Sequence, residues 1–182
     1  MKNALLFLWE VAKIILIAVL IVAPIRYFIF QPFIVQGGSM EPNFQHNNYL
    51  IVDQLSYRFR EPKRGEVIVF NSPEEIERYY IKRIVGLPGE TIQIQNGEVM
   101  ILDNENKIIL NEIFLPENTQ TPGNLKNTLR ENEFFVLGDN RIASSDSRYW
   151  GPLQRKDIIG RVFLRAWPFI IFETPEFIKV NI

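Results

Sequence analysis

The amino-terminal segment most constrains what this chain can fold into, because nearly all of its side chains are apolar. Residues 4–30 carry only three charged side chains, Glu10, Lys13 and Arg26. The uncharged stretch 14–25 would cover about 18 Å of a hydrocarbon core about 30 Å thick, and apolar runs on either side lengthen it. The segment therefore predicts a membrane anchor whose charged side chains lie near the interfaces.

Two alternative interpretations of this segment are weaker. A cleaved secretory signal ends in a small-x-small site, whereas bulky side chains follow the apolar stretch here. A buried core helix would join an unpatterned apolar element to a β-rich remainder. Lysines at positions 2 and 13 favour a cytoplasmic amino terminus. The expected organisation is a cytoplasmic segment (1–12), a transmembrane anchor (13–30) and an extracytoplasmic domain (31–182).

The remainder is predicted to be mainly β, because short runs rich in Val, Ile, Phe and Tyr are bounded by turn residues. The pair Asn96-Gly97 suits a tight hairpin, and residues 103–106 make a second reversal, which gives a three-strand meander. Leu87–Glu90 places proline and glycine at the centre of a type II turn. The expected strands are Tyr49–Val52, Val67–Phe70, Tyr79–Val85, Thr91–Ile94, Val99–Leu102, Lys107–Leu110, Phe134–Leu137 and Arg161–Ala166.

Two further stretches have weaker patterns. Residues 111–132 are polar and show no clear period, which predicts a long surface loop or an insertion. The tail Trp167–Phe172 is apolar but too short to span a bilayer. We expect this tail to form a strand in the core or at the membrane interface.

The composition narrows the chemistry. A net charge of −1 lacks the basic footprint of a nucleic-acid-binding protein. The absence of cysteine excludes thiol catalysis, and a single histidine excludes a multi-histidine metal site. That histidine, His46, lies in a polar loop and is expected to be solvated. We expect neither a metal nor a cofactor.

A serine and a lysine remain as candidate catalytic residues. Ser39 lies in a glycine-rich turn directly after a membrane-proximal strand, although such turns are also common without catalytic function. Lys82 lies in the strand Tyr79–Val85, on the face that it shares with Tyr80 and Ile84. If that face is buried, desolvation lowers the pKa of Lys82, and the neutral amine can accept a proton from Ser39. On an exposed edge, the side chain would instead extend to solvent.

A third polar segment, Gly138–Gly151, follows the predicted strand that ends at Leu137. It combines short hydroxyl and carboxylate side chains with arginines. Side chains of this kind hydrogen-bond the backbone and fix irregular loops. The segment is expected either to orient a catalytic amine or to form a rigid structural corner.

In this order, these segments resemble those of type I signal peptidases, the membrane-anchored serine proteases that remove signal peptides from exported proteins. The resemblance implies a single-pass protein of a bacterial-type plasma membrane with an all-β catalytic domain. Its implied partners are signal-peptide-bearing preproteins and the lipid bilayer, with the secretion machinery as a further candidate and no nucleic acid. The matching blocks are Arg26–Phe33, Gly38–Pro42, Asn48–Val52, Arg64–Phe70, Tyr80–Glu90 and Gly138–Gly151.

The resemblance also implies roles for individual residues. Ser39 would be the nucleophile, with its backbone N–H in the oxyanion hole, and Lys82 the general base. Substrate would bind as an added extended strand, with small residues one and three positions before the cut. The implied supporting residues are Ser144, which would hydrogen-bond the Lys82 amine, Asp146 and Arg148, which would hold the loop by an ion pair, and Asp139 beside them.

Two departures from the family pattern leave rival hypotheses open. Gly37 stands where many members carry a hydroxyl residue that helps to stabilise the oxyanion, and Ile142 and Ala143 are less polar than usual. The Gly37 departure and the long insertion at residues 111–132 leave room for a second hypothesis, a catalytically silent, membrane-tethered domain that captures exported peptides. A soluble self-cleaving Ser-Lys repressor is a third, which the anchor and the lack of a DNA-binding helix pair disfavour.

Overall fold

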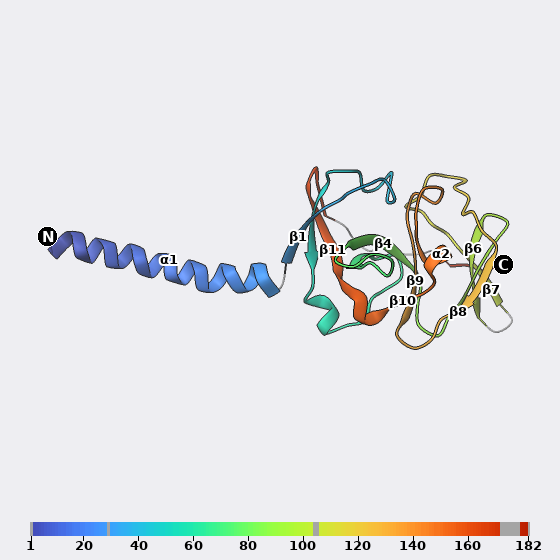
Figure 1. Cartoon of the computed structure of the whole chain (residues 1–182), viewed down its shortest axis with the longest axis horizontal. Coiled ribbons are helices and arrows are strands. Elements are labelled where there is room, and N and C mark those ends of the chain that lie inside the picture. The colour runs from blue at the N-terminus through green and yellow to red at the C-terminus, as the bar shows by residue number, and fades with distance from the viewer. Residues whose placement is uncertain (1, 29, 104–105, 172–178, 182) are drawn as a thin grey trace.

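The computed structural model describes residues 2–28, 30–103, 106–171 and 179–181 of the 182-residue chain. Helix α1 spans Lys2–Phe28, which corresponds to about 40 Å. It projects away from a β-rich body (Figure 1), and none of its apolar window Leu6–Ala23 is buried. The helix begins at Lys2, before the predicted start of the anchor at residue 13. Glu10 and Lys13 do not interrupt it, because they form an ion pair at 2.8 Å on one face of the helix.

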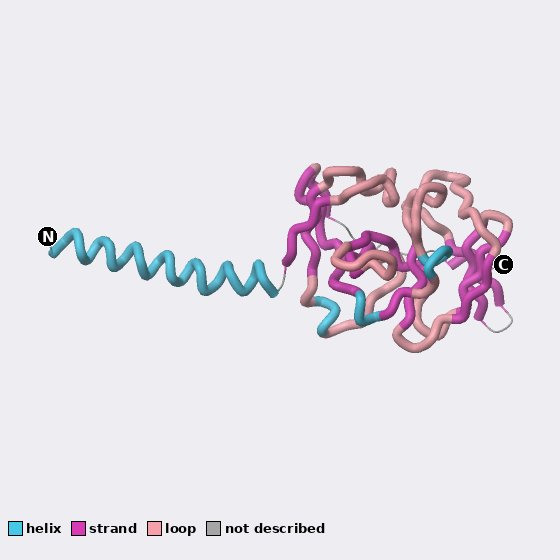
Figure 2. The backbone as a smooth tube through the Cα atoms, in the orientation of Figure 1, coloured by secondary structure: helices cyan, strands magenta, loops and turns pink. Residues whose placement is uncertain are grey.

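The larger sheet lies next to α1 and is antiparallel throughout (Figures 1 and 2). Its strand order is β1-β2-β11-β3-β4-β9-β10, and β12 pairs with β11. Proline 32 is accommodated because β1 is an edge strand. The strands are β1 (Phe30–Ile34), β2 (Tyr49–Asp53), β3 (Val67–Asn71), β4 (Tyr79–Gly86), β9 (Glu133–Leu137), β10 (Leu153–Gln154), β11 (Ile158–Trp167) and β12 (Phe169–Ile171).

The second sheet lies at the end of the body farthest from α1 (Figure 1). Its order is β13-β7-β6-β5-β8, again with antiparallel pairs. Its strands are β5 (Thr91–Gln95), β6 (Glu98–Asp103), β7 (Asn106–Leu110), β8 (Leu125–Thr128) and β13 (Lys179–Asn181). The remaining helical elements are short: η1 (Ser56–Arg58), α2 (Ser147–Trp150) and η2 (Arg155–Asp157).

Strands β4 and β9 form the seam between the two sheets. One hydrophobic cluster joins Val85 and Phe135 from these strands to Ile92 and Ile94 of β5, and all four side chains are fully buried. Burial on both faces explains why β4 is rich in β-branched residues. Lys82 is also on β4, so the candidate base lies on a strand that is buried from Lys82 to Gly86.

The mainly β prediction is confirmed, and each expected strand is present. The hairpin at Asn96-Gly97 has positive φ at both residues, and β5, β6 and β7 form the meander. The second reversal of that meander is centred on Asn104 and Glu105, which lie outside the described residues. The type II turn is present, since the Glu90 N–H donates to the Leu87 carbonyl at 3.2 Å and Gly89 has a φ of +82°.

One prediction requires correction, and one of the two alternatives for the tail is excluded. Within the expected loop 111–132, Leu125–Thr128 forms strand β8 and pairs with β5, because its alternation involves mainly polar side chains that conceal the period. The tail is not a core strand. Its residues Phe169–Ile171 form β12, whose side chains are exposed and which, among the described strands, pairs with Leu164–Ala166 of β11. Phe172 lies outside the described residues, and a membrane-interface location stays a prediction.

Candidate active site

Ser39 lies in a turn that is anchored to the core immediately after the serine. Met40 and Phe44 are almost fully buried in the cluster beside β2, and the Phe44 N–H donates to the Met40 carbonyl at 2.9 Å. Gly37 has a φ of +86°, a conformation that favours glycine. The anchored residues hold the turn against the domain and leave the Ser39 side chain at its surface.

Lys82 reaches Ser39 from strand β4. Its Nζ donates to Ser39 Oγ at 2.8 Å and to the Ile81 carbonyl at 3.0 Å. The residue is only 4% exposed, so its side chain does not extend to solvent. This burial lowers the pKa of Lys82 to about 8, although nearby carboxylates act in the opposite direction. About a tenth of the amine is therefore neutral at pH 7, and the neutral amine can accept a proton.

Ser144 lies beside Ser39 but does not contact Lys82 in the way the resemblance implies. Its hydroxyl is buried and, among the residues described, has no hydrogen-bond partner. Gly138 separates the two serines: a Cβ on Gly138 would lie 2.2 Å from Ser144 Oγ and 2.4 Å from the Ser39 carbonyl oxygen. Only glycine fits between them. Because the Ser144 hydroxyl makes no hydrogen bond to Lys82 here, the orienting role of Ser144 stays a prediction.

Asp146 and Arg148 stabilise the loop that carries Ser144. Arg148 donates from Nε and Nη2 to the two carboxylate oxygens of Asp146, at 2.7 and 2.8 Å. Asp146 is fully buried and also accepts from the Gly138 N–H at 3.0 Å. This ion pair therefore fixes both the loop and the glycine that packs against Ser39.

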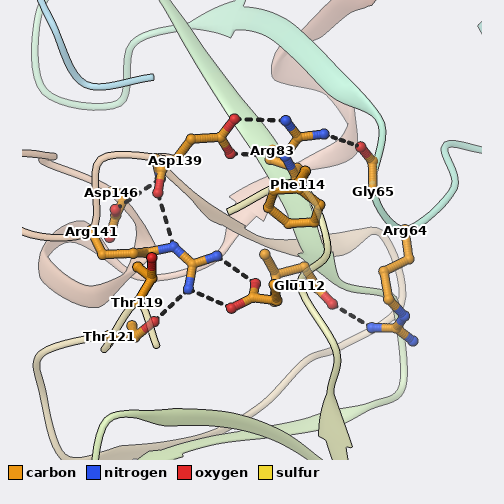
Figure 3. Close-up of polar contacts among 12 residues, drawn as sticks. Arg64, Gly65, Arg83, Glu112, Phe114, Thr119, Thr121, Asp139, Arg141 and Asp146 are labelled. Atoms are coloured by element: carbon orange, nitrogen blue, oxygen red, sulfur yellow. Dashed lines mark hydrogen bonds and ion pairs between the residues drawn. The ribbon is translucent and has the colours of Figure 1, made fainter. Parts of the chain in front are cut away.

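Asp139 forms a second buried ion pair, with Arg83 (Figure 3). Arg83 donates to both carboxylate oxygens at 2.8 and 2.6 Å, and its guanidinium lies 3.9 Å from the centre of the Phe114 ring. Sequence reasoning missed Arg83, although it follows Lys82 directly in an otherwise apolar strand. That unusual pair of adjacent cations was the available signal.

Arg141 connects the loop Gly138–Gly151 to the segment 111–132, which the sequence predicts to be a surface loop or an insertion (Figure 3). It is 2% exposed and forms an ion pair with both carboxylate oxygens of Glu112. It also donates to Thr121 Oγ1 and, from Nε, to the Gly138 carbonyl at 3.0 Å. The segment around Glu112 and Thr121 is therefore a support of the candidate site.

Replacing Glu112 by Gln is expected to destabilise the protein by about 3 kcal/mol, because it leaves the buried Arg141 guanidinium without its counter-charge. For a domain of this size, the loss corresponds to a fall in melting temperature of about 6 to 12 °C, measured by circular dichroism. Glu117→Gln, at an exposed position of the same segment, is the control. Equal melting temperatures for the two variants would contradict the support described here.

His46 contacts the same turn through its ring. It is exposed, as expected, and its Nδ1 accepts from the Gly37 N–H at 3.2 Å. The histidine bonds the backbone and not Ser39 Oγ, so a Ser-His arrangement is not formed. Within the described ranges, no cluster of three or more potential metal ligands occurs.

A groove of about 490 Å³ opens beside Ser39 and Lys82. One wall comes from the end of β1 and the residues after it, and the other from the start of β4. In the described part of the chain, β9 pairs only with Arg83–Gly86, so Tyr79–Lys82 has a strand neighbour on one side only. The apolar lining includes Phe33, Leu50, Val69 and Ile81. This arrangement can accept an extended peptide along a free strand edge.

A serine and a buried lysine beside an open groove, on a β domain that follows an apolar helix, are the features expected of a membrane-anchored serine peptidase. Comparison with known proteins gives the family. The family described as "Signal peptidase, peptidase S26" matches residues 8–167. The chain belongs to this family, and the resemblance found in the sequence is confirmed.

Two relatives agree with this assignment. The chain is 37% identical over 164 residues to "Probable signal peptidase I-2" of Synechocystis sp., covering 87% of this chain and 73% of that protein. It is 36% identical over 166 residues to "Signal peptidase I" of Bacillus caldolyticus, covering 84% and 88%. The crystal structure of a signal peptidase I from Enterococcus faecalis has a TM-score of 0.48 and 29% identity, covering 57% of this chain and 97% of that one.

Proposed function

We propose that this protein removes amino-terminal signal peptides from exported preproteins, cutting after small residues through an acyl-enzyme formed on Ser39. The observation that carries the proposal is the 2.8 Å hydrogen bond between the buried Lys82 amine and the Ser39 hydroxyl. Family membership supports the substrate class. The departure at Gly37 does not remove the nucleophile, the base or the groove.

In the first half of the reaction, the neutral Lys82 amine takes the proton of Ser39 as Oγ bonds to the substrate carbonyl carbon. The carbonyl oxygen becomes an oxyanion, which accepts from the Ser39 backbone N–H. The C–N bond then breaks, and the Lys82 ammonium returns its proton to the leaving amine. In the second half, Lys82 takes a proton from the water that attacks the ester carbon. The bond from that carbon to Ser39 Oγ then breaks, the Lys82 ammonium returns the proton to Ser39 Oγ, and the signal peptide leaves with a free carboxyl group.

The substrate is proposed to bind as an added strand on the free edge at Tyr79–Ile81. Main-chain hydrogen bonds would supply affinity, and the size of the apolar pockets would supply selectivity. Phe33, Leu50 and Val69 line the groove with bulky side chains, which leaves room for small substrate side chains beside Ser39. Small residues one and three positions before the cut are what the family resemblance implies, and the groove is compatible with this because alternate side chains of a strand point to the same face.

The proposed topology has the amino terminus in the cytoplasm and the β domain outside. Strand β1 begins two residues after α1 ends, and its carboxyl end contributes Phe33 and Ile34 to the groove. The groove is therefore tethered close to the bilayer, where the apolar part of a signal peptide also resides. The bilayer and the preprotein are the proposed partners, and the secretion machinery is a further candidate.

The proposal is tested with the full chain reconstituted in liposomes and a purified preprotein that carries an alanine immediately before the cut. Mass spectrometry of the products should give one cut after that alanine. A preprotein with phenylalanine at the same position is the control and should stay intact. Cleavage of both preproteins at equal rates would refute the proposed selectivity, and cleavage of neither would refute the activity.

The rate should depend on pH through Lys82. Only the neutral amine accepts the Ser39 proton, and the neutral fraction grows as pH rises through the lowered pKa of about 8. We expect kcat/KM to increase about tenfold per pH unit below that value and to level off above it. Initial rates on a signal-peptide substrate between pH 6 and 10 measure this. A profile that is flat across pH 6 to 8 would show that Lys82 is not the base.

A further inference from the structure

Asn140 is a residue to which neither the sequence nor the family resemblance assigned a role. It lies in the loop between Gly138 and Arg141, and both of its amide groups bond the turn of the nucleophile. Its backbone N–H donates to the Ser39 carbonyl at 3.1 Å. Its side-chain Nδ2 donates to the Gly38 carbonyl, also at 3.1 Å. Asn140 is therefore bonded to the carbonyls of the two peptide units on either side of the Ser39 Cα.

The orientation of the Asn140 amide follows from its second contact. Its Oδ1 accepts from the Ala143 N–H at 3.1 Å. Exchanging Oδ1 and Nδ2 would place two donors together at Ala143 and two acceptors together at Gly38. The donor end of the side chain is consequently directed at the Gly38 carbonyl.

This contact determines the direction of a catalytic donor. The Gly38 carbonyl and the Ser39 N–H belong to one peptide unit, which is planar, so in the trans form the two bonds point in opposite directions. Fixing the carbonyl therefore fixes the N–H that the proposed mechanism uses for the oxyanion. The Glu41 N–H also donates to the Gly38 carbonyl, at 3.2 Å, but it belongs to the same turn and moves with it. Asn140 connects the peptide unit to a different part of the fold.

The need for an external restraint comes from the glycines. Gly37 and Gly38 precede Ser39, and glycine has the widest choice of backbone conformations. A peptide unit between Gly38 and Ser39 can rotate unless something outside the turn holds it. The loop of Asn140 is itself rigid, because Gly138 is bonded at both ends to the buried side chains of Asp146 and Arg141.

We propose that Asn140 is a positioning residue that orients the Gly38–Ser39 peptide unit, so that the Ser39 N–H points at the developing oxyanion. This inference rests on the proposed function and deepens it, because it supplies a positioning element for an oxyanion site that has Gly37 in place of a hydroxyl residue. It makes one distinctive claim: Asn140 acts on the transition state and not on substrate binding.

The experiment compares Asn140→Ala and Asn140→Asp with wild type in the full chain. The Asp variant keeps an acceptor for the Ala143 N–H but lacks the donor to the Gly38 carbonyl. Both variants should lower kcat by about tenfold or more and change KM by less than about twofold. Ile142→Ala, an 85% exposed position in the same loop, should retain wild-type kcat and KM. Rates are taken at the upper plateau of each pH profile, where Lys82 is neutral. A change in the pKa of Lys82 caused by the new carboxylate of Asn140→Asp then does not affect the comparison.

A second readout uses a peptide aldehyde that carries alanine at its reactive end. Ser39 Oγ adds to the aldehyde carbon, its proton passes to Lys82, and the aldehyde oxygen becomes the anion that the N–H binds. The affinity for this adduct should fall by the same factor as kcat, whereas the affinity for the matching peptide alcohol should not change. Melting temperatures confirm that the variants are folded.

The outcomes separate this proposal from the proposed function. If the wild type cleaves the substrate and Asn140→Ala has an unchanged kcat, the role of Asn140 is overturned and the proposed function stands. The same conclusion holds if Asn140→Ala raises KM alone. Full activity in Asn140→Asp would assign Asn140 only to the Ala143 turn and would also overturn it. Absence of cleavage by the wild type overturns the function and this inference together.

Discussion

Replacing Lys82 by Met is expected to lower kcat/KM by about 10⁴-fold or more. The methionine side chain is similar in length but has no group that can accept the Ser39 proton, and the loss of one member of a catalytic pair typically costs several orders of magnitude. The fold should tolerate the change, because Lys82 lies 4% exposed among packed strands where an uncharged side chain avoids desolvation. Cleavage of a signal-peptide substrate and the melting temperature at pH 7 are the measurements.

Ser39→Ala provides the matched comparison. If the two residues act as a unit, each single variant should lose about as much activity as the double variant, because the second substitution has nothing left to remove. Lys63→Met, at an exposed position, controls for loss of a positive charge. Retention of substantial activity by either Ser39→Ala or Lys82→Met would contradict the mechanism. Peptide binding by the wild type without any cleavage would favour the silent peptide-capturing domain.

The features that could be predicted from sequence are those set by neighbouring residues. Strand periodicity, the Asn96-Gly97 hairpin and the turn at Leu87–Glu90 depend on local backbone preferences, so they were predicted correctly. The same holds for the apolar helix. Strand β8 was missed because its outward side chains are polar and its pairing with β5 is a tertiary contact that no local pattern records.

The supporting contacts of the site could not be predicted for a related reason. Arg83 pairs with Asp139 across 56 positions, and Arg141 pairs with Glu112 across 29. Sequence reasoning placed Lys82 on a face that is buried, but it had no basis for predicting that Arg83, on the opposite face, is buried as well. The burial of both Lys82 and Arg83 is explained by packing on the two faces of β4, where Val85 lies in the cluster shared with the second sheet and Ile84 lies in a different cluster.

Gly138→Ala is expected to reduce kcat by about 100-fold while leaving a folded protein. The added Cβ would lie 2.4 Å from the Ser39 carbonyl oxygen and 2.2 Å from Ser144 Oγ, so the turn of the nucleophile or the loop that carries Gly138 and Ser144 must move by roughly 1 Å. Displacement of this size misaligns Oγ and the Ser39 N–H with the substrate carbonyl, and catalysis is more sensitive to it than stability is.

Gly86→Ala separates this effect from a general packing defect. Its Cβ would lie 2.7 Å from Ile92 and 2.8 Å from Phe135, in the core between the sheets and away from Ser39. Both variants should melt at lower temperature than the wild type, because both overpack a close-packed region. Only Gly138→Ala should lose activity per folded molecule, measured as kcat at a temperature where both proteins remain folded. Equal losses of kcat would mean that Gly138 is needed for packing alone, and the spacing between Ser39 and Ser144 would then have no catalytic consequence.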